Sequence, residues 1–267
     1  MKNLLMCCPD HFDVSYDINH WMHGQEGRVD LAKAMQQWEA LVSALSEVST
    51  ISFIDGIEGL PDLVFTANGG IIQGQTAIVS TFKTKERQPE EAVFHEWFKS
   101  KEFEIYQIKA KYEGEGDHLR DDRGRHWMGS GFRTEKEAAG ELEEILGGKI
   151  NVLELIDPRW YHLDTAFCPL PYGGVMWYPG AFSSTSQYKI RSTFSINLEV
   201  SLEDALLFCC NCICIDDKLF MPKGSKVIDK LGRLGYNVWE GDLSEFMKAG
   251  GASKCLVLDC NYKPTRK

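Results

Sequence analysis

The sequence predicts an α/β fold in which five similar units surround a common centre. Four residues suited to catalysis stand at nearly constant intervals of 47, 47 and 93 residues, the last being about two steps: Asn68, Glu115, His162 and Cys255. Apolar runs and breakers repeat in the order strand, strand, helix, strand, and no Pro/Gly/Ser-rich linker divides them. Because repeats of this kind bring equivalent positions to one centre, we expect one domain over residues 1–267 with one central site.

The first two units follow from the spacing of apolar residues. Apolar side chains recur at helical spacing over residues 30–45, which predicts a helix, and residues 49–53 follow as a strand. The second unit begins with two short apolar runs that are typical of strands. Its expected elements are strands 70–73 and 76–80, helix 90–101 and strand 104–108.

The remaining units repeat this order with one gap. Thr134, with Glu137 three residues later, has the pattern of a capping box and predicts the start of a helix at 135–146. Residues 183–197 are rich in Ser, Thr, Gln and Lys and receive no assignment. The other expected elements are strands 126–129, 151–156, 174–178, 211–215, 218–222 and 236–239, helix 225–234 and a loop at 241–254. Asn211 takes the place in the fourth unit where a site residue is expected.

Composition and charge exclude several classes of protein. The formal net charge is −10 and the pI is near 5.2, which disfavours nucleic-acid and anionic-membrane partners. No apolar run approaches the roughly 18 residues that span a bilayer, and the N-terminus lacks the apolar core of a signal peptide. We therefore expect a cytoplasmic protein with a small-molecule substrate, and leave open a homo-oligomer.

Nine cysteines without a secretory signal favour reduced thiols over disulfides. Four of them lie at positions 209, 210, 212 and 214, in an apolar run with β character from 205 to 215. Alternate residues of a strand point to opposite faces, so at most two or three of these thiols share a side. No second CxxC pair and no His-x₃₋₅-His completes a zinc set. We favour structural core cysteines over a metal site and expect no metal.

Cys255 and His162 are the candidates for nucleophile and acid/base. Cys255 follows Gly-Gly-Ala-Ser-Lys, where a tight glycine loop and the charge of Lys254 both favour a thiolate. A cysteine before Leu-Val-Leu alone indicates a core residue, but its place in the repeat favours the nucleophile. His162 and Asp164 share one face of an extended segment, and histidine titrates near neutral pH. A structural histidine is the alternative.

The acidic stretch Glu113-Gly-Glu115-Gly-Asp117 alternates with glycine. Its carboxylates suit bidentate pairing with a guanidinium group, whereas a solvated turn is the plain alternative. Asn68, in Phe-Thr-Ala-Asn-Gly-Gly, would by itself indicate only a turn at a strand end.

These segments together resemble the guanidino-group-modifying (pentein) superfamily, which includes arginine deiminases, amidinotransferases and dimethylarginine dimethylaminohydrolases. Phe-Thr-Ala-Asn, Glu-Gly-Glu-Gly-Asp, His-Leu-Asp-Thr and Gly-Gly-Ala-Ser-Lys-Cys carry the resemblance, which extends over residues 10–260. It implies a five-bladed α/β propeller with no metal or organic cofactor, a cysteine nucleophile and a histidine acid/base.

Asn68 stands where arginine deiminases typically carry Asp, and together with Asn19 this is similar to the arginine dihydrolases. The implied reaction converts arginine to ornithine, CO₂ and two ammonia. A one-step deiminase or dimethylarginine dimethylaminohydrolase that releases citrulline is the alternative in the same family, and a catalytically silent binding propeller is the alternative outside enzymes.

The resemblance also suggests a role for each site residue. Cys255 attacks the guanidinium carbon and His162 transfers protons, while Glu115 and Asp164 hold the guanidinium. Asn68, Asn19, Asp117 and Asn211 complete the substrate site. Arg133 is a candidate for the substrate α-carboxylate, because a guanidinium forks onto carboxylates, and an Arg facing solvent is equally compatible.

Overall fold

The described chain folds into five small three-stranded sheets, and the strands of all five are connected in the same way. In this computed structural model, which describes residues 1–260, the first strand of each sheet is antiparallel to the second. A helix then leads to a third strand, which is parallel to the second. The predicted order of strand, strand, helix and strand is confirmed.

The first unit joins the two ends of the described chain. β15 (Leu258–Asp259) pairs with β1 (Lys2–Cys7), and α1 (Leu31–Ser46) leads on to β2 (Ser49–Ile54). The other units are β3 (Gly70–Gln73), β4 (Thr76–Val79), α2 (Glu90–Ser100) and β5 (Glu104–Gln107); β6 (His118–Arg120), β7 (His126–Ser130), α4 (Ala138–Leu146) and β8 (Ile150–Glu154); β9 (Phe167–Leu170), β10 (Gly174–Trp177), α5 (Ser184–Thr193) and β11 (Ile196–Glu199); and β12 (Ile213–Ile215), β13 (Lys218–Pro222), α7 (Ile228–Arg233) and β14 (Asn237–Gly241). Three short helices lie between them, namely α3 (Gly114–Asp117), α6 (Leu202–Leu206) and α8 (Ser244–Met247).

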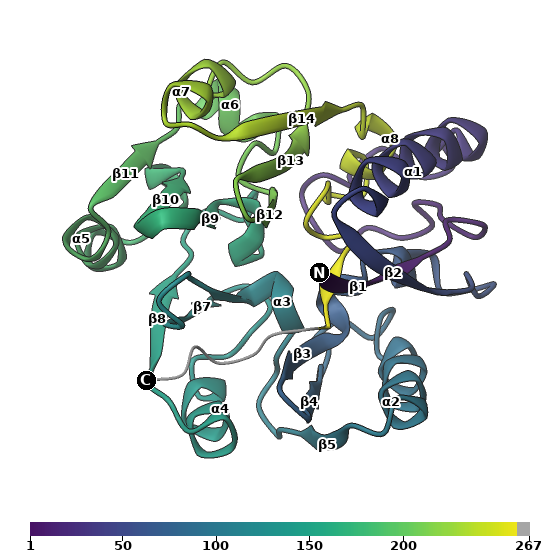
Figure 1. Cartoon of the computed structure of the whole chain (residues 1–267). Coiled ribbons are helices and arrows are strands. Elements are labelled where there is room, and N and C mark those ends of the chain that lie inside the picture. Colours follow the sequence, from purple (N-terminus) through teal and green to yellow (C-terminus); the bar gives the residue numbers. More distant parts are fainter. Residues whose placement is uncertain (261–267) are drawn as a thin grey trace.

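Figure 1 shows the five sheets arranged around a common centre, with α1, α2, α4, α5 and α7 on the outside. α1 illustrates why each helix forms. The Asp30 side chain accepts a hydrogen bond from the Lys33 backbone N–H and caps the first turn. Ala34, Leu41 and Leu45 are fully buried on the inner face at helical spacing. The large buried side chains between neighbouring sheets include Trp127 and Trp177, so the core lies between the units.

Two local predictions are wrong. The expected capping box does not form, because α4 begins at Ala138 and Glu137 makes no side-chain cap. Instead, the Thr134 hydroxyl accepts a hydrogen bond from the Glu113 backbone N–H at 3.1 Å, so a tertiary partner replaces the local one. Residues 205–215 also do not form one strand. Phe208 adopts a left-handed conformation with φ of 55°, which separates α6 from the short strand β12.

The unassigned stretch 183–197 contains α5 and the first two residues of β11. Ser183 caps α5 by accepting from the Ser186 backbone N–H, and Ile190 is its fully buried apolar contact. A helix with so few apolar residues is hard to recognise from periodicity. Within residues 1–260, no helix is long and apolar enough to cross a membrane.

Candidate active site

Each unit contributes a predicted polar residue that lies shortly before its first strand. These residues are Asn68 at the end of η2 (Thr66–Gly69), Glu115 in α3, His162 before η3 (Leu163–Thr165), Asn211 before β12 and Cys255 before β15. All five are buried, with at most 4% of their surface exposed. The constant spacing in the sequence therefore corresponds to equivalent positions in the repeat.

Cys255 lies between Asp164 and Asn211. Its Sγ donates to Asp164 Oδ2 at 3.1 Å, and the Asn211 side-chain amide donates to Sγ at 3.0 Å. Asn211 Oδ1 also accepts from the backbone N–H groups of Cys255 and Ala252, so this amide holds the whole loop that carries the thiol. Burial, followed by the charge of Asp164, raises the pKa of Cys255 well above its usual range. Without substrate, therefore, the sulfur is a thiol.

His162 is held by Glu113, which the sequence analysis did not select. The imidazole Nε2 lies 2.7 Å from Glu113 Oε2, and Arg133 Nη1 donates to the same oxygen at 3.1 Å. Burial alone would raise the pKa of Glu113, but Arg133 and His162 hold that pKa well below its usual range. The ring of Tyr161 contacts both groups, with Arg133 Cζ 4.8 Å from its centroid and the His162 ring centroid 4.6 Å away at a tilt of 48°. A carboxylate whose charged form is favoured thus contacts the imidazole.

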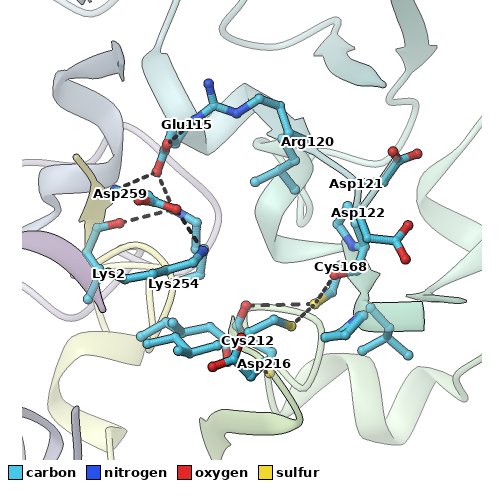
Figure 2. Close-up of a pocket in the computed structure, with 18 of the residues that line it drawn as sticks. Lys2, Glu115, Arg120, Asp121, Asp122, Cys168, Cys212, Asp216, Lys254 and Asp259 are labelled. Atoms are coloured by element: carbon cyan, nitrogen blue, oxygen red, sulfur yellow. Dashed lines mark hydrogen bonds and ion pairs between the residues drawn. The ribbon is translucent and has the colours of Figure 1, made fainter. Parts of the chain in front are cut away.

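Glu115 points away from this pair. Its carboxylate accepts from Lys254 Nζ at 2.9 Å and from Arg120 Nη2 at 3.4 Å, and also from the Asp259 backbone N–H (Figure 2). Glu115 therefore has different partners from Glu113, and the predicted contact of Glu115 with a guanidinium stays a prediction. The reason is local: residues 114–117 form one helical turn, which rotates alternate side chains by about 200°.

Asn68 is fixed by Arg87, another residue that the sequence analysis missed. Arg87 Nη1 donates to Asn68 Oδ1 at 2.7 Å and pairs with the buried carboxylate of Glu90. A guanidinium only donates, so Asn68 must present its oxygen to Arg87 and its amide nitrogen elsewhere. Asn68 Nδ2 is buried and has no hydrogen-bond partner among the described residues.

Gly116 allows Asn68 and His162 to approach each other. A Cβ atom at Gly116 would lie 2.1 Å from Asn68 Nδ2 and 3.3 Å from His162 Nδ1. Only glycine fits between the two side chains. The unpartnered amide nitrogen therefore borders the same small space as the imidazole.

Two further carboxylates complete the site. Asp164 Oδ1 is buried without a hydrogen-bond partner among residues 1–260. Asp117 Oδ1 accepts from the Leu163 backbone N–H at 2.9 Å and so fixes the segment that follows His162. Burial raises the pKa of Asp164 and that of Asp117 to about 6. The site is thus rich in buried carboxylates that a cationic ligand would stabilise in their charged form.

The segment 8–30 between β1 and α1 covers the Arg133 side of the site. Arg133 Nη2 donates to the Ile18 carbonyl at 2.9 Å. Asn19 Nδ2 donates to the Ala249 carbonyl at 3.0 Å, close to the loop before Cys255. Asn19 and Arg133 therefore tie this segment to the site, and their side chains are already used within the protein.

A group of three cysteines with metal-ligand spacing lies outside the set of catalytic candidates. Among residues 1–260, the one grouping of at least three side chains with metal-ligand spacing is Cys168, Cys212 and Cys214, which excludes the catalytic candidates. The expectation that the cysteines at 209–214 lack a metal set considered only thiols within that run. In the structure a third thiol, Cys168 of β9, joins two of them, and the expected absence of a metal stays a prediction.

Glu113 could have been found from spacing, since it lies 49 residues before His162 and Asn211 lies 49 residues after it. Arg87 gives no such signal, because it lies outside the repeat position and only the fold brings it to Asn68.

Comparison with known proteins identifies relatives that cover almost the whole of this chain. The chain is 41% identical over 260 residues to the bifunctional arginine dihydrolase/ornithine cyclodeaminase AgrE of Nostoc sp., a match that covers 95% of this chain and 37% of that protein. A second bifunctional relative, ArgZ of Synechocystis sp., is also covered over 37% of its length. The chain thus spans little more than a third of these two proteins.

One relative and one crystal structure match this chain over most of their own length. The chain is 35% identical to the N(G),N(G)-dimethylarginine dimethylaminohydrolase of Mycobacterium tuberculosis, over 97% of this chain and 85% of that protein. A crystal structure of the N-terminal domain of ArgZ, an arginine dihydrolase bound to product, superposes with a TM-score of 0.98 at 38% identity, covering 99% of both chains. Another structure of that domain contains a covalently bound reaction intermediate. No protein-family model matches the sequence. The chain belongs to the family of cysteine-dependent guanidino-group hydrolases that includes these arginine dihydrolase domains and dimethylarginine dimethylaminohydrolases.

Proposed function

We propose that residues 1–267 act as one catalytic domain, a five-bladed propeller that hydrolyses arginine twice. The overall reaction takes arginine and two waters to ornithine, CO₂ and two ammonia. The amide of Asn68 is the observation that favours two rounds, and the relatives named above support the substrate. Cys255, His162, Glu113, Asp164 and Asn68 carry the chemistry in this proposal.

Binding begins with the buried carboxylates. Asp164 Oδ1 has no hydrogen-bond partner among the described residues and can accept from a guanidinium N–H. A bound cation stabilises the ionised form of Asp164, whose pKa burial raises to about 6. The guanidinium therefore restores the charge that burial disfavours, and it lies beside the Cys255 sulfur because Asp164 contacts both.

The same cation activates the nucleophile. Burial holds the pKa of Cys255 high in the free protein, but a positive charge next to the sulfur lowers the pKa again. The thiol proton leaves to solvent, and the amide of Asn211 then donates to the thiolate. The thiolate attacks the central carbon of the guanidinium, which forms a C–S bond and a tetrahedral intermediate.

His162 transfers the protons. In this proposal its imidazolium form, with Nε2 2.7 Å from Glu113 Oε2, protonates the departing nitrogen as the C–N bond breaks. The neutral imidazole then removes a proton from water, which attacks the S-linked amidino carbon and releases the Cys255 thiolate. The first round thus yields ammonia and a citrulline that is still bound.

The second round depends on Asn68. Citrulline carries a neutral ureido oxygen, and Asn68 Nδ2 is a buried donor without a partner among the described residues. An amide can donate to this oxygen, whereas a carboxylate would repel it. Thiolate attack on the ureido carbon expels the second ammonia, and hydrolysis of the resulting thiocarbamate gives ornithine and CO₂. Asn68 therefore retains the intermediate in this proposal.

The geometry gives Arg133 and Asn19 supporting roles. Arg133 donates to Glu113 and to the Ile18 carbonyl, so we assign it to positioning Glu113 and segment 8–30. We propose that this segment opens for substrate entry and that Asn19 closes it on the loop before Cys255, through Ala249. The earlier assignment of Arg133 to the substrate carboxylate is less compatible with these contacts.

A one-step hydrolase of arginine or methylated arginine is the second candidate, favoured by the 35% identity to a dimethylarginine dimethylaminohydrolase. A substrate panel separates the two. The purified protein is incubated with arginine, dimethylarginine and citrulline, and the amine products are separated by chromatography. We expect ornithine from arginine and little reaction with dimethylarginine. Faster release of dimethylamine than of ammonia would replace the proposal with the one-step alternative.

A further inference from the structure

A pocket lies where the first, third, fourth and fifth units meet. It has a volume of about 840 Å³, and strands β9 and β12, the β6 region and the N-terminal strand all contribute to its lining. Figure 2 shows Glu115, Lys254 and Arg120 on one side of it and Cys168 and Cys212 on another. Cys255 and His162 do not line this pocket. The catalytic scheme above leaves the thiol side unused.

Three thiols from two units meet at this wall. Cys168 comes from β9 of the fourth unit, Cys214 lies on β12 of the fifth, and Cys212 immediately precedes β12. Their sulfur atoms all lie within 4.8 Å of one another, and Cys168 Sγ is 3.6 Å from Cys214 Sγ. Cys212 and Cys214 are two residues apart in an extended segment, so both face the same side.

The distance between two of these sulfurs is close to that in a metal thiolate centre. A tetrahedral zinc ion with Zn–S bonds of about 2.3 Å separates its sulfur ligands by about 3.8 Å. The 3.6 Å between Cys168 Sγ and Cys214 Sγ is about 0.2 Å shorter than that value, and the other two sulfur pairs lie within 4.8 Å. The exposure of the three thiols also suits a bound ion. Cys168 and Cys212 are nearly inaccessible, whereas Cys214 is partly exposed and lines the pocket. The pocket gives an ion a path to the sulfurs.

We propose that Cys168, Cys212 and Cys214 form a binding site for one zinc ion, with three thiolate ligands and a fourth position open to the pocket. Binding would release the thiol protons to solvent, and no oxidant is needed. A water molecule or a small ligand in the pocket would complete the tetrahedron. The ion would tie the fourth unit to the fifth.

The site is also connected to the catalytic loop. Cys212 directly follows Asn211, whose side chain contacts Cys255 Sγ and the backbone of the catalytic loop. An ion on Cys212 would therefore fix the chain next to a residue that holds the nucleophile. Charge at the pocket is compatible with a cation, because Asp121, Asp122 and Asp216 also line it (Figure 2).

Cadmium titration tests this site directly. The full chain carrying Cys255→Ser is used under anaerobic reducing conditions, because the catalytic thiol would itself bind thiophilic ions. Added Cd²⁺ should produce the ultraviolet sulfur-to-cadmium charge-transfer band, which should saturate at one ion per chain. Zn²⁺ should displace the cadmium and abolish the band. Absence of the band at one equivalent would overturn the proposal.

Matched variants in the same background locate the ligands. Cys168→Ala and Cys214→Ala, from different units, should each weaken cadmium binding at least tenfold in competition with a chromophoric chelator. Cys210→Ala is the control, because Cys210 lines the same pocket but is outside the group of three thiols, and it should bind as the parent does. Circular dichroism establishes that each variant is folded. Two folded ligand variants that bind cadmium as tightly as the parent would contradict the assignment.

Discussion

Exchange of Glu113 for Gln separates the two glutamates of the acidic stretch. Glu113→Gln keeps the shape of the side chain but removes the charge that holds His162 at 2.7 Å and Arg133 at 3.1 Å. The imidazolium form of His162 then loses its carboxylate partner. Glu115→Gln is the matched control, because its partners Lys254 and Arg120 are not the acid/base.

The expected magnitude follows from the lost interaction. A hydrogen bond to a charged group contributes about 1.5–3 kcal/mol, and each 1.36 kcal/mol changes a rate about tenfold. Glu113→Gln should therefore lower kcat by about 10- to 10²-fold. Glu115→Gln leaves the buried charge of Lys254 poorly compensated, and breaking such a pair costs about 3–5 kcal/mol of stability. It should lower Tm while changing kcat by less than about threefold, within the range of an indirect effect.

Ammonia release from arginine measures kcat, and titration of Cys255 with a thiol-reactive analogue counts the active molecules. Because kcat is expressed for each active molecule, a loss of folded protein does not change its value. Equal losses of kcat in the two variants, or a larger loss in Glu115→Gln, would refute the assignment of Glu113 to His162. A normal kcat in Glu113→Gln would refute it as well.

Four other changes have definite expected outcomes. Cys255→Ser should leave the fold intact, seen by circular dichroism, and remove turnover, because a hydroxyl is far less ionised than a thiol; more than trace activity would exclude Cys255 as the nucleophile. His162→Ala should lose on the order of 10²-fold or more in kcat, the usual scale for a positioned acid/base, and an unchanged rate would make His162 structural. Asn68→Asp should shift the product from ornithine to citrulline on chromatography, and a variant that still makes only ornithine would move retention to Asn19 or to closure of segment 8–30. In a pH series, kcat/KM should fall as pH drops below about 6, because protonation of Asp164 removes the acceptor for the guanidinium. A fall in kcat/KM with its midpoint far from that pH would exclude this role of Asp164.

The repeat could be predicted from the sequence because its site residues recur at nearly constant intervals. Asn68, His162, Asn211 and Cys255 lie at equivalent places before a first strand, as their intervals indicate. The strands and most helices followed from apolar periodicity, which reflects burial between the units. The helix at α5 did not, because its few apolar residues leave almost no periodic signal.

The site was harder to predict where local conformation decides which way a side chain points. Alternation in an extended segment would put Glu113 and Glu115 on one face, but the helical turn of α3 puts them on different faces. Arg87 reaches Asn68 only through the tertiary fold. Cys168 likewise joins Cys214 from another unit, and no spacing within one run reveals that contact.

The ratio of ammonia released to arginine consumed distinguishes two rounds of hydrolysis from one. With enzyme in excess over arginine labelled at the guanidino carbon, a single turnover is quenched and ammonia, ornithine and labelled CO₂ are measured together. Two rounds of hydrolysis give two ammonia and one ornithine for each arginine, with the label in CO₂. One ammonia for each arginine, with the label retained in citrulline, would contradict the proposal.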